Sequence, residues 1–180
     1  MRNKGFTLVE LLVVIAIIGV LSVAIIAVVK PNIPNTATQQ VKEAFYPEPT
    51  GYLVDSANVL SSKTKETLTQ ELSAFDQIAQ VAVVTVKTTE PLDIEQYSIK
   101  LAEKWKVGYK GLDNGVILVV AVDDRKLRIE VGRGLEGGFT DLRAKEIVDQ
   151  IIVPYFKQGK FDEGIDAGVK AIQQQIRYAK

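Results

Sequence analysis

The hydrophobic pattern divides the chain into one long apolar run and a longer region of alternating helix and strand signals. Residues 11–29 form a stretch of nineteen uncharged residues, interrupted only by Gly19 and Ser22. A helix of that length measures about 28 Å, close to the ~30 Å hydrocarbon core of a bilayer. A helix packed on a soluble core would show a polar face, and this run has none. The pattern therefore predicts one N-terminal transmembrane helix, from Phe6 to Val29, in contact with the lipid bilayer.

The residues on either side of the run predict its orientation and its connection to the rest of the chain. Arg2 and Lys4 precede it, and the positive-inside tendency then places the N-terminus in the cytoplasm. The region after the helix is expected on the extracytoplasmic side of the cell membrane. Residues 30–49 contain four prolines, which interrupt helices, so we expect a linker there.

Residues 50–180 show the periodicity of a single α/β domain. A helix is predicted from Ser61 or Ser62 through Ala79, because Leu68, Leu72 and Phe75 fall on one face. Further helices are expected at 93–105, 141–156 (bent or ended near Pro154) and 161–178. Apolar or alternating runs predict strands at 80–87, 115–122 and 126–132.

The connections between these strands predict the sheet topology. A helical crossover joins 80–87 to 115–122, which makes that pair parallel. A short turn at Asp123 leads into 126–132, which makes the last pair antiparallel. Helices before, between and after the strands then predict a three-layer α/β/α sandwich with a small mixed sheet.

Composition excludes several classes of function. Lys plus Arg and Asp plus Glu both number 22, and this balance argues against a nucleic-acid partner. Cysteine and histidine are absent, which removes disulfides, thiolate nucleophiles, the histidine base and most zinc sites. Any chemistry must therefore use carboxylates, hydroxyls, lysine, tyrosine or a hard cation.

A glycine-rich segment formally matches the dinucleotide-binding fingerprint. It runs from Gly132 to Gly137 and follows a strand. That strand is the second arm of a hairpin, and no later strand completes a βαβ unit or supplies a ribose-binding acid. We therefore interpret the glycines as a tight exit from the sheet and expect no nicotinamide cofactor.

Carboxylates gather at both ends of the predicted sheet. Where the central strand begins and its hairpin partner ends, the sequence places Asp113, Asn114, Glu136 and Asp141. Oxygen ligands of this kind suit calcium or magnesium. A good turn at residues 113–115 and a favourable acid at a helix start explain the same residues without a metal. An alternative cluster at the opposite end consists of Asp55, Asp123 and Asp124.

The first residues resemble the leader of type IV prepilins. Residues 1–5 form a short basic peptide ending in Gly5, followed by Phe6 and, inside the apolar run, by Glu10. The resemblance implies that a prepilin peptidase cleaves between Gly5 and Phe6 and that Phe6 is then N-methylated. It also implies a role for Glu10, whose charge would otherwise be costly in a bilayer, as the partner of the new α-amino group. An ordinary signal anchor and a signal peptide cut after Ala24 remain the alternatives.

The region beyond residue 50 resembles the TPM domain family. The matching motifs are YLVDSANVLS at 52–61, WKVG at 105–108, DNG at 113–115, IEVGRGLEG at 129–137 and TD at 140–141. The resemblance implies an α/β/α sandwich outside the cytoplasm, beside a membrane segment. Members of the family include a photosystem II repair factor and a nematode modulator of acetylcholine receptors. Acid-phosphatase activity and calcium binding have been proposed for some members.

Three functions are consistent with these features. The first is an anchored accessory module that binds an unknown membrane-protein partner. The second is a metal-dependent phosphatase that uses Asp113, Glu136 and Asp141. The third is a pilin-like or pseudopilin subunit, although the prolines after Val29 interrupt the long first helix that pilins use.

Overall fold

The computed structural model describes residues 44–179. The predicted leader, the transmembrane helix and most of the predicted linker lie outside these residues. Within 44–179, none of the helices combines the length and the apolar character that a membrane crossing needs.

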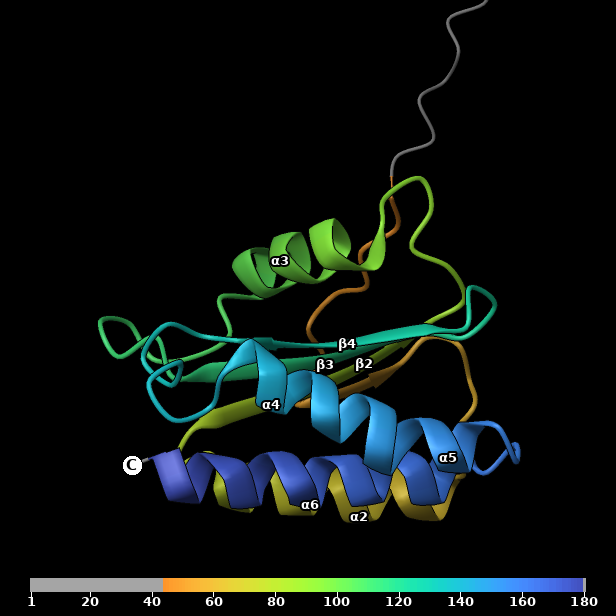
Figure 1. The fold of residues 1–180 in the computed structure, drawn as a ribbon. Coiled ribbons are helices and arrows are strands. Elements are labelled where there is room, and N and C mark those ends of the chain that lie inside the picture. The colour runs from red at the N-terminus through yellow and green to blue at the C-terminus, as the bar shows by residue number, and fades with distance from the viewer. Residues whose placement is uncertain (1–43, 180) are drawn as a thin grey trace, which may run out of the picture. The chain divides into compact units, whose positions relative to one another are not determined.

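Four strands form one mixed sheet in the order β1-β2-β3-β4 (Figure 1). The strands are β1 (Leu53–Asp55), β2 (Gln80–Val86), β3 (Gly115–Ala121) and β4 (Lys126–Val131). β1, β2 and β3 are parallel, and β4 returns antiparallel to β3. This confirms the predicted crossover and hairpin. β1 was not predicted, because three half-buried residues carry too little periodicity to be recognised.

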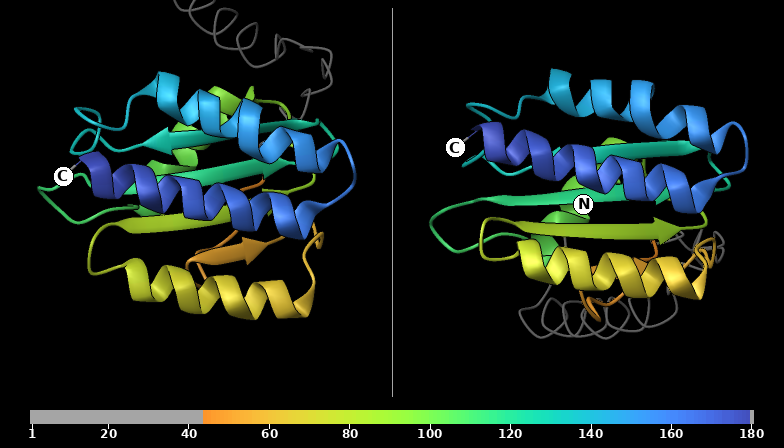
Figure 2. Two further views of the ribbon diagram at one scale, coloured as in Figure 1. Left: turned by 60° about the horizontal axis from the view of Figure 1, so that its bottom comes forward. Right: turned by 90° about the horizontal axis from the view of Figure 1, so that it is seen from below.

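Helices cover both faces of the sheet (Figure 2). One face carries α2 (Ser62–Phe75), α6 (Phe161–Ala179) and the helical run α4 (Asp141–Glu146), η1 (Ile147–Ile152) and α5 (Val153–Phe156). The other face carries α3 (Ile94–Trp105). The α/β class with a small mixed sheet is therefore confirmed.

Two apolar clusters hold these layers together, one on each face of β2 and β3. Alternate residues of β3 serve the two clusters, as the period of a strand requires: Leu118 packs toward α2 and α6, whereas Ile117 and Val119 pack toward α3. All seven residues of β3 are buried. This explains why the sequence there reads as an unbroken apolar run rather than an alternating one.

The helix ends follow the capping residues that the sequence supplies. Ser61 accepts a hydrogen bond from the Thr64 N–H at the start of α2, and Asp93 accepts one from the Gln96 N–H at the start of α3. α2 ends at Phe75, four residues before the predicted end, and three turn residues follow it. The helix ends early because Ala79 is needed at the entry to β2, where it is fully buried.

The predicted helix at 141–156 forms as one run with a π-helical segment in its middle. Pro154 has no N–H to donate, so an α-helical ladder fails at that position. The preceding turns widen instead, and the Val153 N–H donates to the carbonyl oxygen of Val148, five residues back. The helix therefore passes the proline without breaking.

Residues 44–49, the N-terminal strap, pack on α3 rather than forming free linker. The Tyr97 hydroxyl donates to the Phe45 carbonyl at 2.6 Å, and the Trp105 indole N–H donates to the Pro47 carbonyl at 2.9 Å. The Tyr46 ring stacks on Tyr97 with centroids 4.9 Å apart. The single helix α3 is too narrow to cover the whole face of a four-stranded sheet. The strap covers part of the remaining face, because it packs against the apolar cluster beneath α3.

Candidate functional site

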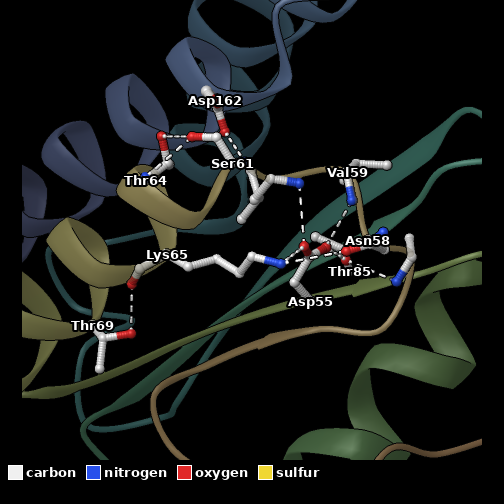
Figure 3. Close-up of polar contacts among 11 residues, drawn as sticks. Asp55, Asn58, Val59, Ser61, Thr64, Lys65, Thr69, Thr85 and Asp162 are labelled. Atoms are coloured by element: carbon white, nitrogen blue, oxygen red, sulfur yellow. Dashed lines mark hydrogen bonds and ion pairs between the residues drawn. The ribbon is translucent and has the colours of Figure 1, made fainter.

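Asp55, the last residue of β1, lies at the centre of a polar network between the sheet and α2 (Figure 3). Its Oδ1 accepts from the Val59 N–H at 3.1 Å and from the Thr85 hydroxyl at 2.5 Å. Its Oδ2 accepts from the Leu60 N–H at 3.1 Å and forms an ion pair with Lys65 Nζ at 3.0 Å. A carboxylate offers about four lone-pair positions, and four donors of the chain itself use them here.

The surroundings keep this carboxylate ionised. Only 2% of the Asp55 side chain is exposed, and burial by itself raises the pKa of a carboxyl group. The donors from Thr85, Val59, Lys65 and Leu60 outweigh the burial and hold the pKa of Asp55 below its usual value. Asp55 is therefore a charged clamp that fixes the loop between β1 and α2.

Thr85 extends the clamp across two strands. It is fully buried in β2, and its Oγ1 donates to Asp55 while accepting from the Ala57 N–H at 3.2 Å. Sequence reasoning did not single out Thr85 or Lys65. The sequence did offer one signal: Thr85 carries the single hydroxyl in the otherwise apolar run 81–86. A polar side chain buried in a strand needs a hydrogen-bond partner, so this hydroxyl indicated a contact with another polar group.

Asp124 forms a second clamp at the same end of the sheet. Its Oδ2 accepts from the Thr89 N–H at 2.8 Å and from the Thr89 hydroxyl at 3.2 Å. Burial raises the pKa of Asp124, but the donors from Thr89 and Thr88 and the charge of Lys126 lower it further than burial raises it. The turn after β3 is thereby tied to the loop after β2. Asp123, the third member of the alternative cluster, is exposed.

At the opposite end of the sheet, Asn114 organises a loop. It is buried, its Oδ1 accepts from the Tyr109 N–H at 3.0 Å, and its amide donates to the Ile78 carbonyl at 3.4 Å. Asp113 next to it is exposed and has a left-handed backbone conformation, with φ of 44°. This is the turn geometry expected for Asp-Asn-Gly.

Glu136 and Asp141, the other two predicted ligands, are also exposed. Asp141 opens α4 and lines a small pocket with Glu95 and Arg128. Burial lowers the pKa of Arg128, but the acids Glu130, Asp141 and Glu95 raise it above its usual value.

Neither predicted set of acids forms a metal-binding arrangement within the described residues. Across 44–179, no three acidic side chains are grouped so that they could hold a metal ion. Calcium or magnesium binding therefore stays a prediction, and no chemical step is assigned to a metal.

The glycine-rich segment after β4 has the predicted packing role. A Cβ at Gly132 would collide with the Asp113 carbonyl oxygen, and one at Gly134 would collide with the Leu112 carbonyl oxygen. The glycines thus let the exit from β4 pass directly over the loop before β3. Gly137, by contrast, has open space around its Cα.

Comparisons with known proteins match two parts of the chain. A family model described as the TPM domain matches residues 53–175, and a second, described as the prokaryotic N-terminal methylation motif, matches residues 1–26. The second match supports an N-terminal membrane anchor that a prepilin peptidase processes. No curated protein matches the chain.

Three solved structures share the fold. The N-terminal domain of a protein from P. gingivalis is 34% identical, with 71% of this chain and 82% of that chain covered and a TM-score of 0.65. The N-terminal domain of a protein from Corynebacterium glutamicum is 17% identical, with 73% and 84% covered and a TM-score of 0.54. The BA42 protein of the psychrophilic bacterium Bizionia argentinensis is 20% identical, with 67% and 83% covered and a TM-score of 0.53. The family match spans most of the chain, and the P. gingivalis domain supports it in both sequence and fold. The chain therefore belongs to the TPM domain family.

Proposed function

We propose that this protein is a membrane-anchored accessory module whose TPM domain binds a membrane-protein partner on the extracytoplasmic side. The main support for this proposal is that one chain contains both a methylation motif, at residues 1–26, and a TPM domain, at residues 53–175. An anchor confines the domain to a thin layer above the bilayer. Its effective concentration for partners in the same membrane is raised accordingly.

The clamps at the carboxyl ends of the parallel strands support a binding role. Asp55 and Asp124 both accept hydrogen bonds from backbone N–H groups of neighbouring loops. Charged acceptors of this kind position loops firmly. A rigid set of loops suits recognition of a partner, because little conformational entropy is then lost on binding.

The proposal is tested by photo-crosslinking in cells that express the full chain. A photoreactive amino acid replaces, one at a time, an exposed residue in each loop after β1, β2 and β3: Ser56, Lys87 and Asp123. The expected result is a discrete adduct with an integral membrane protein from at least one position. The matched control carries the photoreactive group at Glu66, an exposed charged residue of α2. If all three positions give only the background seen at Glu66, the accessory role is refuted.

A phosphatase is the second candidate, favoured by the name TPM phosphatase that the matching family model carries. It predicts steady hydrolysis of a phosphate ester by the purified full chain in calcium or magnesium. Asp113→Ala and Asp141→Ala are then expected to abolish turnover, whereas Glu66→Ala, at an exposed residue outside both predicted metal sets, leaves it unchanged. Turnover with this pattern would replace the accessory role with an enzymatic one.

The anchor and its orientation are tested separately. Mass spectrometry of the mature chain is expected to find an N-terminus at methylated Phe6, and protease added to intact spheroplasts is expected to degrade the TPM domain. An intact Met1 would contradict the prepilin route, and a protected domain would contradict the orientation. A search for this protein in sheared filaments tests the pilin-like alternative.

A further inference from the structure

A groove of about 580 Å³ lies between the β3–β4 hairpin and the turn that joins α5 to α6. This is within the size range of ligand-binding sites in proteins. Its apolar lining includes Leu127 near the start of β4, Val153 and Phe156 of α5, and Phe161 at the start of α6. The rings of Phe156 and Phe161 contact each other, with centroids 4.8 Å apart and planes inclined at 51°.

The aromatic wall is held in place by the helix beneath it. A Cβ at Gly164 would meet the Phe156 ring at 2.7 Å, so the absence of a side chain there lets the ring lie directly on α6. Both phenylalanines are half-buried, which leaves part of each ring open to the groove. The wall is therefore preformed, and a ligand would not have to order it.

The rim of the groove is positively charged. Arg125 of the hairpin turn, Lys126 at the start of β4 and Lys157 just after α5 line it, and no acidic residue does. All three cations are exposed. Within residues 44–179, neither Arg125 nor Lys157 forms an ion pair, and Lys126 interacts with Asp124. The chain as a whole has no net charge, so this local excess does not follow from a generally basic surface.

We propose that the groove binds an acidic peptide segment whose aliphatic or aromatic side chains pack on Phe156 and Phe161. Acidic side chains of the ligand would pair with Arg125 and Lys157 at the rim. Complementary charge favours such a partner and repels basic ones. This inference rests on the proposed function in one respect only: it takes the segment to belong to the membrane-protein partner.

A flat anionic lipid surface fits the same region less well. Asp123 and Glu163 are exposed and lie within two residues of the groove-lining residues Val122 and Phe161. Exposed acids so near the groove in sequence reduce the net positive charge that a planar anionic surface would meet in this region. A peptide side chain can enter the groove and pack on the half-buried rings of Phe156 and Phe161, whereas a planar surface meets the exposed cations at the rim.

The test uses the full chain in nanodiscs of zwitterionic lipid and a fluorescein-labelled peptide of alternating glutamate and leucine. Fluorescence anisotropy is expected to show saturable binding that weakens as salt is added. One matched peptide has glutamine in place of glutamate, and another has serine in place of leucine. Both are expected to bind at least ~10-fold more weakly, because each lacks one of the two recognised features.

Charge reversal locates the binding site. The variant R125E/K157E is expected to bind the acidic peptide at least ~10-fold more weakly, since two attractions become repulsions. The control K63E/K110E makes the same change in net charge at exposed lysines outside the groove and is expected to bind as the wild type does.

Three results would overturn the proposal. The first is the absence of saturable binding by the wild type, and the second is equal weakening in R125E/K157E and K63E/K110E. The third is displacement of the peptide by inorganic phosphate, or by anionic lipid in the nanodisc, at matched ionic strength. That result would identify a simple anion site or a lipid contact. Failure of this titration leaves the crosslinking test of the accessory role intact, so the two proposals can fail separately.

Discussion

Replacement of Asp55 by alanine is expected to destabilise the TPM domain more than any exposed acid does. The substitution leaves the Val59 and Leu60 N–H groups and the buried Thr85 hydroxyl without their acceptor. A hydrogen bond to a charged group contributes about 1.5–3 kcal/mol. Lys65 is 36% exposed, so its ion pair adds only about 0.5 kcal/mol.

Three such hydrogen bonds at the lower figure, plus the ion pair, sum to about 5 kcal/mol. Water that enters the space left by the carboxylate recovers part of this loss. We therefore expect Asp55→Ala to reduce the free energy of unfolding by about 3–4 kcal/mol, and Asp55→Asn, which keeps the shape and one oxygen, by about 2 kcal/mol. The exposed control Asp123→Ala is expected to cost less than about 0.5 kcal/mol.

Urea unfolding of the full chain measures these differences, with the fluorescence of Trp105, the one tryptophan of the chain, as the probe. The midpoint should shift while the slope stays constant, because the surface exposed on unfolding does not change. A cost below about 1 kcal/mol for Asp55→Ala, or a cost equal to that of Asp123→Ala, would refute the clamp.

The pH dependence of the same experiment follows from the direction of the pKa shift. The pKa of Asp55 is lowered in the folded chain from an ordinary value of 3.8. Its stabilisation is therefore fully present above that value and is lost as the pH falls through the lower folded-state pKa. The difference between wild type and Asp55→Asn should be constant near neutral pH and shrink at pH values below 3.8. A difference that grows on acidification would contradict the assignment.

Three further predictions concern the other parts of the domain. Gly134→Ala is expected to cost about 2–3 kcal/mol through collision with the Leu112 carbonyl, whereas Gly137→Ala, which meets open space, should be near neutral in the same urea assay. Tyr97→Phe removes the hydrogen bond to Phe45 and should cost about 1 kcal/mol while speeding proteolysis within residues 44–49. The exposed control Tyr178→Phe should change neither. Calcium titration by calorimetry tests the predicted metal sites: saturable heat that Asp113→Ala removes would support the first set, and a flat trace would contradict calcium binding.

Local patterns in the sequence were enough to predict most of the secondary structure. The β-branched run of β2, the alternation of β4 and the capping residues Ser61 and Asp93 each specify their element through nearest neighbours. Chain connectivity then specified the parallel and antiparallel pairings, because a short turn and a helical crossover leave few alternatives. The family resemblance came from ordered motifs and needed no coordinates.

The long-range contacts depended on the tertiary structure. The register that places Thr85 opposite Asp55 in the sheet converts two unremarkable polar residues into one clamp. Nothing in the sequence near Phe45 or Pro47 indicates that their carbonyl groups accept hydrogen bonds from α3. The groove likewise joins the β3–β4 turn to residues more than twenty-five positions later in the chain.

The sequence alone predicted the N-terminal anchor and indicated the α/β class and the family, because solvation and local periodicity act along the chain. The tertiary structure alone decided which carboxylates act as clamps and where cations meet an apolar wall. These features depend on distances between residues far apart in sequence, and only the packed fold specifies those distances.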